Sequence, residues 1–126
     1  MPKFGQRSLD RLSTVDTRLQ RLFNEVIKYW DCTVLEGIRT LERQRKLVAQ
    51  GSSKTMNSKH LTGMAVDVAP YPVDWNDHER FIRFGLFVIG MAAGMGIPVR
   101  WGRDWDKDFD LNDQQFNDSP HFEIME

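Results

Sequence analysis

Residues 58–69 read SKHLTGMAVDVA, and the second half of this stretch alternates as a strand with one buried face does. Met64, Val66 and Val68 are expected on the buried face, which leaves Asp67 between two alanines on the other face. Small neighbouring side chains leave room beside the carboxylate for an ion and a substrate. The stretch therefore predicts a strand that presents an acid in open space.

The segments around this strand alternate between helical and extended patterns. Apolar residues recur at three- and four-residue steps from Leu9 to Trp30, which predicts one amphipathic helix. The other expected elements are a strand at Cys32–Ile38, a helix from the Thr40 cap to about Gln50, a helix from Asn76 or Asp77 to about Ala93, and strands at Ile97–Trp101 and His121–Met125. We expect an α+β fold whose helices pack on one side of a small, mainly antiparallel sheet.

Length, composition and charge limit the classes of protein. A chain of 126 residues with 40% hydrophobic and 28% charged residues suits a single domain, residues 1–126. Seventeen Lys+Arg against eighteen Asp+Glu give no basic field, so we expect no binding to nucleic acid or membrane. We also expect the protein to be a monomer. The start of the chain lacks the apolar block of a signal peptide. The lone Cys32 cannot form an intramolecular disulfide.

Two of the three histidines precede or begin predicted strands. His60 and His121 could form a three-point metal site with Asp67. Zinc in catalytic sites takes three such ligands and leaves a fourth position to water, whose pKa falls from about 15.7 to near 7. On the residues alone, an alternative stays open in which these are a loop histidine, a strand-edge acid and a half-buried ring. His78 is interpreted as a solvated helix residue.

A longer motif makes the metal interpretation specific. Residues 58–67 reproduce the pattern S-x-H-x-x-G-x-A-x-D in full, and Pro-His-Phe-Glu follows at 120–123. The sequence resembles the zinc peptidases of the D-alanyl-D-alanine carboxypeptidase family, above all the short L-alanyl-D-glutamate endopeptidases that tailed bacteriophages use as endolysins. The resemblance covers residues 37–123, about two-thirds of the chain. It implies a hedgehog/DD-peptidase-like fold, with zinc held by His60, Asp67 and His121.

The resemblance also implies the catalytic groups. Asp118 corresponds to the family's catalytic base, which takes a proton from the attacking water and passes it to the leaving amine. Its alternative role is that of a turn-forming acid. Arg39 corresponds to an arginine that binds the scissile carbonyl oxygen or a substrate carboxylate, and its alternative is a surface ion pair.

Three further polar residues have two interpretations each. Gln44 and Ser58 match family positions and could bind substrate or shape the pocket, but simple solvent exposure is equally compatible with the sequence. Glu123 shares an alternating face with His121, so it either orients that ligand or has only a structural role.

Residues 101–105, WGRDW, resemble the family's W-G-G-D-W except that Arg103 replaces a glycine, which puts the local loop conformation in doubt. Trp101 and Trp105 could stack on substrate, although packing is favoured. An acidic cluster that could hold calcium follows at Asp104, Asp106, Asp108, Asp110, Asn112 and Asp113. It lacks the glycine and glutamate of a calcium loop, so a solvated acidic loop is favoured.

The resemblance implies a zinc-dependent peptidoglycan endopeptidase that cuts between L-alanine and D-glutamate of the stem peptide and lyses the phage host. We expect the protein to stay in the host cytoplasm until a membrane pore lets it reach the cell wall. Two alternatives stay open. One is a D-alanyl-D-alanine carboxypeptidase or dipeptidase, and the other is a non-catalytic, zinc-stabilised module that binds the cell wall.

Overall fold

The computed structural model describes residues 2–51, 56, 58–103 and 118–125. The elements in chain order are α1 (Gln6–Leu12), α2 (Thr17–Val26), β1 (Cys32–Glu36), α3 (Leu41–Ala49), the 3₁₀ helix η1 (Lys59–Thr62), β2 (Ala65–Pro70), α4 (His78–Gly94), β3 (Val99–Gly102) and β4 (Asp118–Ile124). The strands form one antiparallel sheet in the order β1-β2-β4-β3. This arrangement confirms the predicted α+β class.

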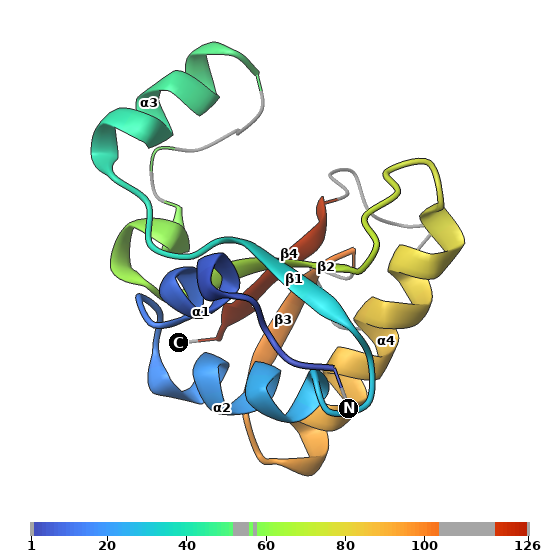
Figure 1. Cartoon of the computed structure of the whole chain (residues 1–126). Helices are drawn as coiled ribbons and strands as arrows, with labels where there is room; N and C mark the ends of the chain where they lie inside the picture. Colours follow the sequence, from blue (N-terminus) through green and yellow to red (C-terminus); the bar gives the residue numbers. More distant parts are fainter. Residues whose placement is uncertain (1, 52–55, 57, 104–117, 126) are drawn as a thin grey trace.

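The core lies between one face of the sheet and helices α2 and α4 (Figure 1). Val66 and Val68 of β2 are fully buried in it, and Asp67 lies on the opposite face, as the alternation predicts. Helix α1 instead covers the open edge of β1, where Ser8 accepts a hydrogen bond from the Val34 N–H at 3.0 Å. Helix α3 projects away from the other helices.

The single helix predicted from Leu9 to Trp30 is wrong, because the chain turns between α1 and α2. The Asp16 side chain accepts a hydrogen bond from the Arg18 N–H at 2.8 Å and so starts α2. Val15 in the turn is buried, which preserves the apolar spacing through the break, whereas Leu9 is 44% exposed. Hydrophobic periodicity alone therefore could not locate the interruption.

The expected helix caps at Thr40 and Asp77 are confirmed. The Thr40 side chain accepts a hydrogen bond from the Arg43 N–H, and Asp77 does the same for Arg80. Gly51 follows α3 with a φ of 77° and ends it as predicted. Within the part of the chain that the structure describes, none of the helices is long and apolar enough to span a bilayer.

Gly85 of α4 faces the indole of Trp101, and a Cβ there would lie 2.1 Å from the ring. Trp101 is itself packed on Phe122, with 6.5 Å between ring centroids. We expect Gly85→Ala to destabilise the protein by about 1–3 kcal/mol, because the ring has no space to retreat. Gly90 on the same helix has nothing within 4 Å, so Gly90→Ala should be neutral or stabilise by up to about 1 kcal/mol. Urea unfolding measures both, and equal midpoints would contradict the expectation.

Candidate metal centre

Strands β2 and β4 bring Asp67 and His121 together as directly paired residues, and η1 adds His60. One ligand atom from each of the three lies within 4.8 Å of the others. His60 Nε2 is 3.1 Å and His121 Nδ1 is 3.3 Å from the same oxygen, Asp67 Oδ1. The three side chains therefore form a compact group with the dimensions of a metal site.

The local sequence fixes the position of His60. The Ser58 side chain accepts a hydrogen bond from the His60 N–H and starts η1. Gly63, with a φ of 74°, ends η1 and turns the chain into β2. The His60 carbonyl accepts a hydrogen bond from the Arg39 N–H at 2.8 Å. Ser58 is half-buried and contributes to the site by holding the backbone of a ligand candidate.

The outer ring nitrogens of both histidines have hydrogen-bond acceptors. His60 Nδ1 lies 2.9 Å from the Gly37 carbonyl, and His121 Nε2 lies 2.8 Å from Glu123 Oε1. A carbonyl oxygen and a carboxylate can only accept, so each outer nitrogen carries the hydrogen. The inner nitrogens, His60 Nε2 and His121 Nδ1, face the Asp67 carboxylate, where a ring nitrogen can either donate a proton or, when the ring is neutral, offer a lone pair to a metal ion. Converging acceptors repel unless a cation lies between them, and two nitrogens with one oxygen are a donor set that zinc takes.

Charges inside the group also favour a cation. Burial opposes ionisation of Asp67, but hydrogen bonds with His121 and His60 outweigh it and hold the pKa of the carboxyl well below its usual range. Burial likewise opposes the charged form of His121, yet Asp67 and Glu123 raise the pKa of this ring to about 9. Asp67 and Glu123 therefore stabilise positive charge at His121, which is a proton in the metal-free group and would be replaced by a bound metal ion.

Glu123 orients His121 and is itself held by two cations. Arg100 donates to Glu123 Oε2 at 2.8 Å, and Lys59 Nζ lies 3.4 Å from the same oxygen. Burial opposes its ionisation, but His121 and Arg100 lower the pKa of Glu123 to about 2. Of the two interpretations of Glu123, the structure favours the one in which it orients a ligand.

Replacing Glu123 tests this orienting role. We expect Glu123→Gln to weaken zinc binding by about 10-fold, toward the lower end of the range seen when groups behind metal-bound histidines are removed. The amide keeps the shape but loses the negative charge that supports the ring. Titration with a chromogenic zinc chelator measures the affinity. Glu25→Gln, which changes an exposed acid paired with Lys28, is the control, and equal affinities of the two variants would contradict the role.

Arg39 lies beside the group, with Nη2 3.9 Å from Asp67 Oδ2. Its side chain is 8% exposed and donates from Nε to Glu36 at 2.9 Å and from Nη1 to Gln44 Oε1 at 2.7 Å. Arg39 does form an ion pair, but the predicted surface position is wrong, because the pair with Glu36 is part-buried and lies beside Asp67. Solvent exposure of Gln44 is also wrong, since this residue is fully buried and holds Arg39 in place.

Glu36 reaches the site because β1 contains an irregularity. Val34 pairs with Val68, but Glu36 pairs with Asp67, so the register shifts between Val34 and Glu36. Strict alternation from Cys32 and Val34 would direct Glu36 into the core, whereas the bulge turns it to the face of Asp67. Glu36 was not predicted as a site residue, because its signal in the sequence is only an acid at a position in phase with core residues.

Asp118 begins β4, and its Oδ2 lies 3.9 Å from His121 Nδ1. Burial raises the pKa of the Asp118 carboxyl, and the charge of Asp67 raises it further, which makes the group a better proton acceptor. The sheet register is irregular here, and Gly102 pairs with Asp118. A Cβ at Gly102 would lie 2.1 Å from the Asp118 carbonyl, so this close approach requires glycine. This role of Gly102 was not predicted from the sequence.

The remaining candidates lie elsewhere. Trp101 is 1% exposed and belongs to the core, so stacking of this residue on substrate is wrong; its Nε1 donates to the Ser119 carbonyl at 2.8 Å. His78 is the exposed first residue of α4, as expected. Trp105 and the acidic cluster at 104–113 lie outside the described residues.

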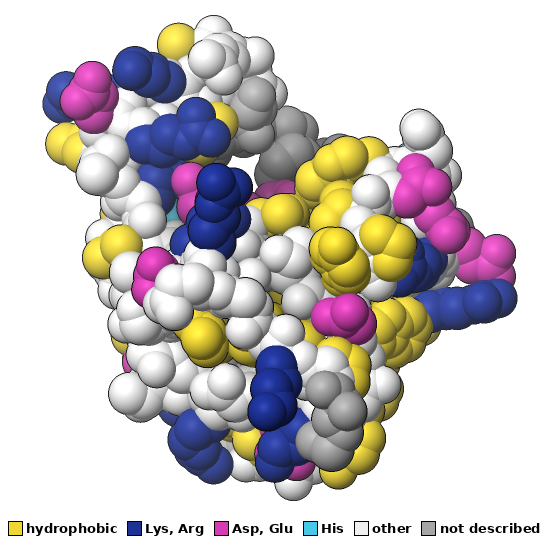
Figure 2. Space-filling view, in the orientation of Figure 1, with side chains coloured by type: hydrophobic (Ala, Val, Ile, Leu, Met, Phe, Trp, Pro, Cys, Tyr) yellow, Lys and Arg dark blue, Asp and Glu magenta, His cyan; other side chains and the backbone are white. Residues whose placement is uncertain are grey.

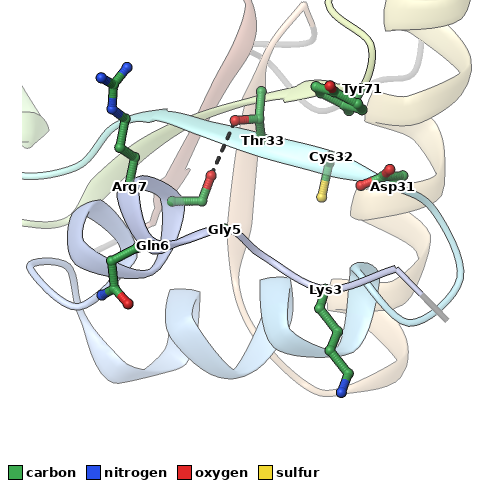
Figure 3. A pocket seen from close by; sticks show the side chains of 9 residues that line it. Lys3, Gly5, Gln6, Arg7, Asp31, Cys32, Thr33 and Tyr71 are labelled. Carbon is green, nitrogen blue, oxygen red and sulfur yellow. Dashed lines mark hydrogen bonds between the residues drawn. The ribbon is translucent and has the colours of Figure 1, made fainter.

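A separate hollow lies beside β1 and the start of α1 (Figure 3). It is lined by Lys3, Gly5, Gln6, Arg7, Ser8, Asp31, Cys32, Thr33 and Tyr71, none of which belongs to the His60–Asp67–His121 group. Burial raises the pKa of the Cys32 thiol to about 12, so the thiol stays protonated at neutral pH and is a poor nucleophile. The Cys32 thiol of this hollow is therefore not a candidate nucleophile.

Two imidazoles and a carboxylate, with a further carboxylate and a guanidinium beside them, form the arrangement of a metal-dependent hydrolase. Comparison with known proteins makes the class specific. The family model described as phage L-alanyl-D-glutamate peptidase matches residues 1–125, and the chain belongs to this family.

Individual relatives agree with this assignment. The L-alanyl-D-glutamate peptidase of Escherichia phage T5 is 35% identical over 120 residues, which cover 89% of this chain and 88% of the relative. The Serratia marcescens L-Ala D-Glu endopeptidase ChiX is 33% identical with a TM-score of 0.79, over 98% of this chain and 90% of that one. The D,D-pentapeptidase VanY, solved with Zn(II), shares the fold at 20% identity and a TM-score of 0.52, over 90% of this chain and 70% of that one. The predicted family and peptidase activity are thereby confirmed.

Proposed function

We propose that this chain is a zinc-dependent peptidoglycan endopeptidase, a phage endolysin, that hydrolyses the bond between L-alanine and D-glutamate of the stem peptide. The observation that carries the proposal is the convergence of His60, Asp67 and His121, whose ligand atoms lie within 4.8 Å of one another. The choice of bond is supported by the similarity to the phage T5 protein, an L-alanyl-D-glutamate peptidase, and to ChiX, an L-Ala D-Glu endopeptidase.

The residues around the group have distinct tasks in this reaction. When bound, a zinc ion supplies a water of lowered pKa and a Lewis acid for the peptide carbonyl. Asp118, 3.9 Å from His121, accepts the proton of the attacking water and returns it to the leaving amine. The Arg39 guanidinium, held by Glu36 and Gln44, stabilises negative charge developing on the carbonyl oxygen.

Gln44 and Ser58 serve the reaction indirectly in this proposal. Gln44 holds the guanidinium of Arg39, and Ser58 holds the backbone of His60, so neither needs to touch the substrate. We further propose that residues 1–126 act as one monomeric catalytic domain on peptidoglycan, without a nucleic-acid or membrane partner. The protein would remain in the host cytoplasm until it gains access to the wall.

Calcium is a second ion suggested by the acidic residues at 104–113. The favoured interpretation is a solvated loop, so we expect peptidase activity to stay flat when calcium is titrated through the millimolar range. A saturable rise in activity would show that calcium regulates the enzyme.

The proposed reaction is tested by mass spectrometry of purified peptidoglycan after digestion. We expect new fragments that end in L-alanine and fragments that begin with D-glutamate. A chelator should abolish them, and added zinc should restore them, because the reaction needs the ion. Release of free D-alanine would instead favour the carboxypeptidase alternative. Intact peptides in the presence of zinc-loaded protein would favour the non-catalytic module.

A further inference from the structure

Arg43 lies next to Arg39 and shares its acidic partner. Arg39 donates to Glu36 Oε1, and Arg43 Nε lies 3.6 Å from Glu36 Oε2. The Arg39 side chain is 8% exposed, whereas that of Arg43 is 52% exposed. Glu36 thus bridges two guanidiniums. That of Arg39 lies 3.9 Å from the Asp67 carboxylate, and that of Arg43 lies at the surface.

The position of Arg43 on the chain is well defined. Its N–H donates to Thr40 Oγ1 at 3.1 Å, which anchors it in the first turn of α3. Figure 2 shows Lys and Arg side chains gathered on α3, above the rest of the molecule. Glu36 contacts both guanidiniums, whereas Asp67 lies 3.9 Å from that of Arg39, so the positive charge that Glu36 compensates least lies at the exposed Arg43. An anionic group of a substrate would be attracted to it.

The proposed substrate has such a group. The scissile bond ends on the nitrogen of D-glutamate, and glutamate has two carboxyl groups. A linear peptide continues through only one of them, so the other remains free, within a few bonds of the scissile nitrogen. This free carboxylate lies close to the scissile bond without taking part in the reaction. A cationic side chain at the edge of the metal centre could therefore bind it while the bond is cleaved.

We propose that Arg43 binds the free carboxylate of the substrate's D-glutamate and thereby sets specificity for this residue. The inference rests on the proposed function and names the residue that recognises the substrate. Arg39 is nearly buried, with its guanidinium engaged by Glu36 and Gln44. Arg43 keeps half of its side chain exposed, and its planar fork can hold a carboxylate with two hydrogen bonds.

Two peptides that differ in one group provide the test. One contains L-alanyl-D-glutamate with the free carboxylate, and the other carries a carboxamide in its place. We expect the wild type to prefer the carboxylate peptide and Arg43→Gln to reduce the ratio of the two kcat/KM values by about 10- to 100-fold. Arg43→Lys keeps the charge without the fork and should reduce the ratio less. Arg45→Gln, an exposed change on the same helix, is the matched control.

The possible outcomes distinguish a failure of the proposed role of Arg43 from a failure of the proposed endopeptidase function. If Arg43→Gln lowered kcat/KM for both peptides by the same factor, Arg43 would act only through Glu36 and Arg39, and the inference would be wrong. It would also be wrong if the wild type cleaved both peptides equally well. If the zinc-loaded wild type cleaved neither peptide, the proposed function itself would fail. Zinc content is measured for every variant, so that metal loss is not mistaken for loss of recognition.

Discussion

His60→Ala is expected to abolish both zinc binding and hydrolysis of peptidoglycan. The change removes one of three converging ligand atoms and leaves His121 and Asp67, fewer than the three protein ligands of a catalytic zinc site. Loss of a group that merely orients a ligand costs about 10- to 100-fold in metal affinity, so loss of the ligand itself should cost more. Activity should fall to that of chelator-treated wild type.

Zinc content by inductively coupled plasma mass spectrometry and release of wall fragments give the two readouts. His78→Ala is the matched control, because it removes an exposed imidazole at the start of α4. This control should keep full zinc content and activity. Circular dichroism verifies that His60→Ala remains folded, since His60 is buried and bonded to Gly37. Undiminished zinc in folded His60→Ala would remove this residue from the set of ligands.

Asp118→Asn is expected to separate catalysis from metal binding. The amide has nearly the shape of the carboxylate but cannot accept a proton, so the attacking water loses its base. General-base catalysis contributes about 10²- to 10⁴-fold, and kcat should fall within that range. Zinc content should stay at the wild-type level, because Asp118 Oδ2 lies 3.9 Å from His121 Nδ1, beside the three proposed ligands.

Single-turnover and steady-state assays on a stem peptide measure this loss, with metal content determined on the same samples. Asp10→Asn on the exposed side of α1 is the control and should leave kcat unchanged. Retention of wild-type kcat by zinc-loaded Asp118→Asn would refute the assignment of the base. A parallel loss of zinc would instead indicate that Asp118 belongs to the metal-binding group.

Local sequence was sufficient to predict part of the candidate site. The alternation of β2 separates Val66 and Val68 from Asp67, and the motif at 58–67 connects Asp67 with His60. The same reasoning could not choose between the two interpretations of Gln44, because its hydrogen bond with Arg39 and its burial appear only in the folded structure. It also joined α1 and α2 into one helix, because the apolar spacing continues through the turn.

The sequence by itself determined the strand carrying Asp67, the candidate metal ligands that the motif suggests, and the family, because each depends on short spacing or on a contiguous pattern. Only the tertiary structure decided that Glu36 turns to the face of Asp67 and that Gly102 admits Asp118. Sheet register caused both outcomes. Register depends on which strands pair and where a residue is left out of the ladder, and neither property is encoded in the residues of one strand alone.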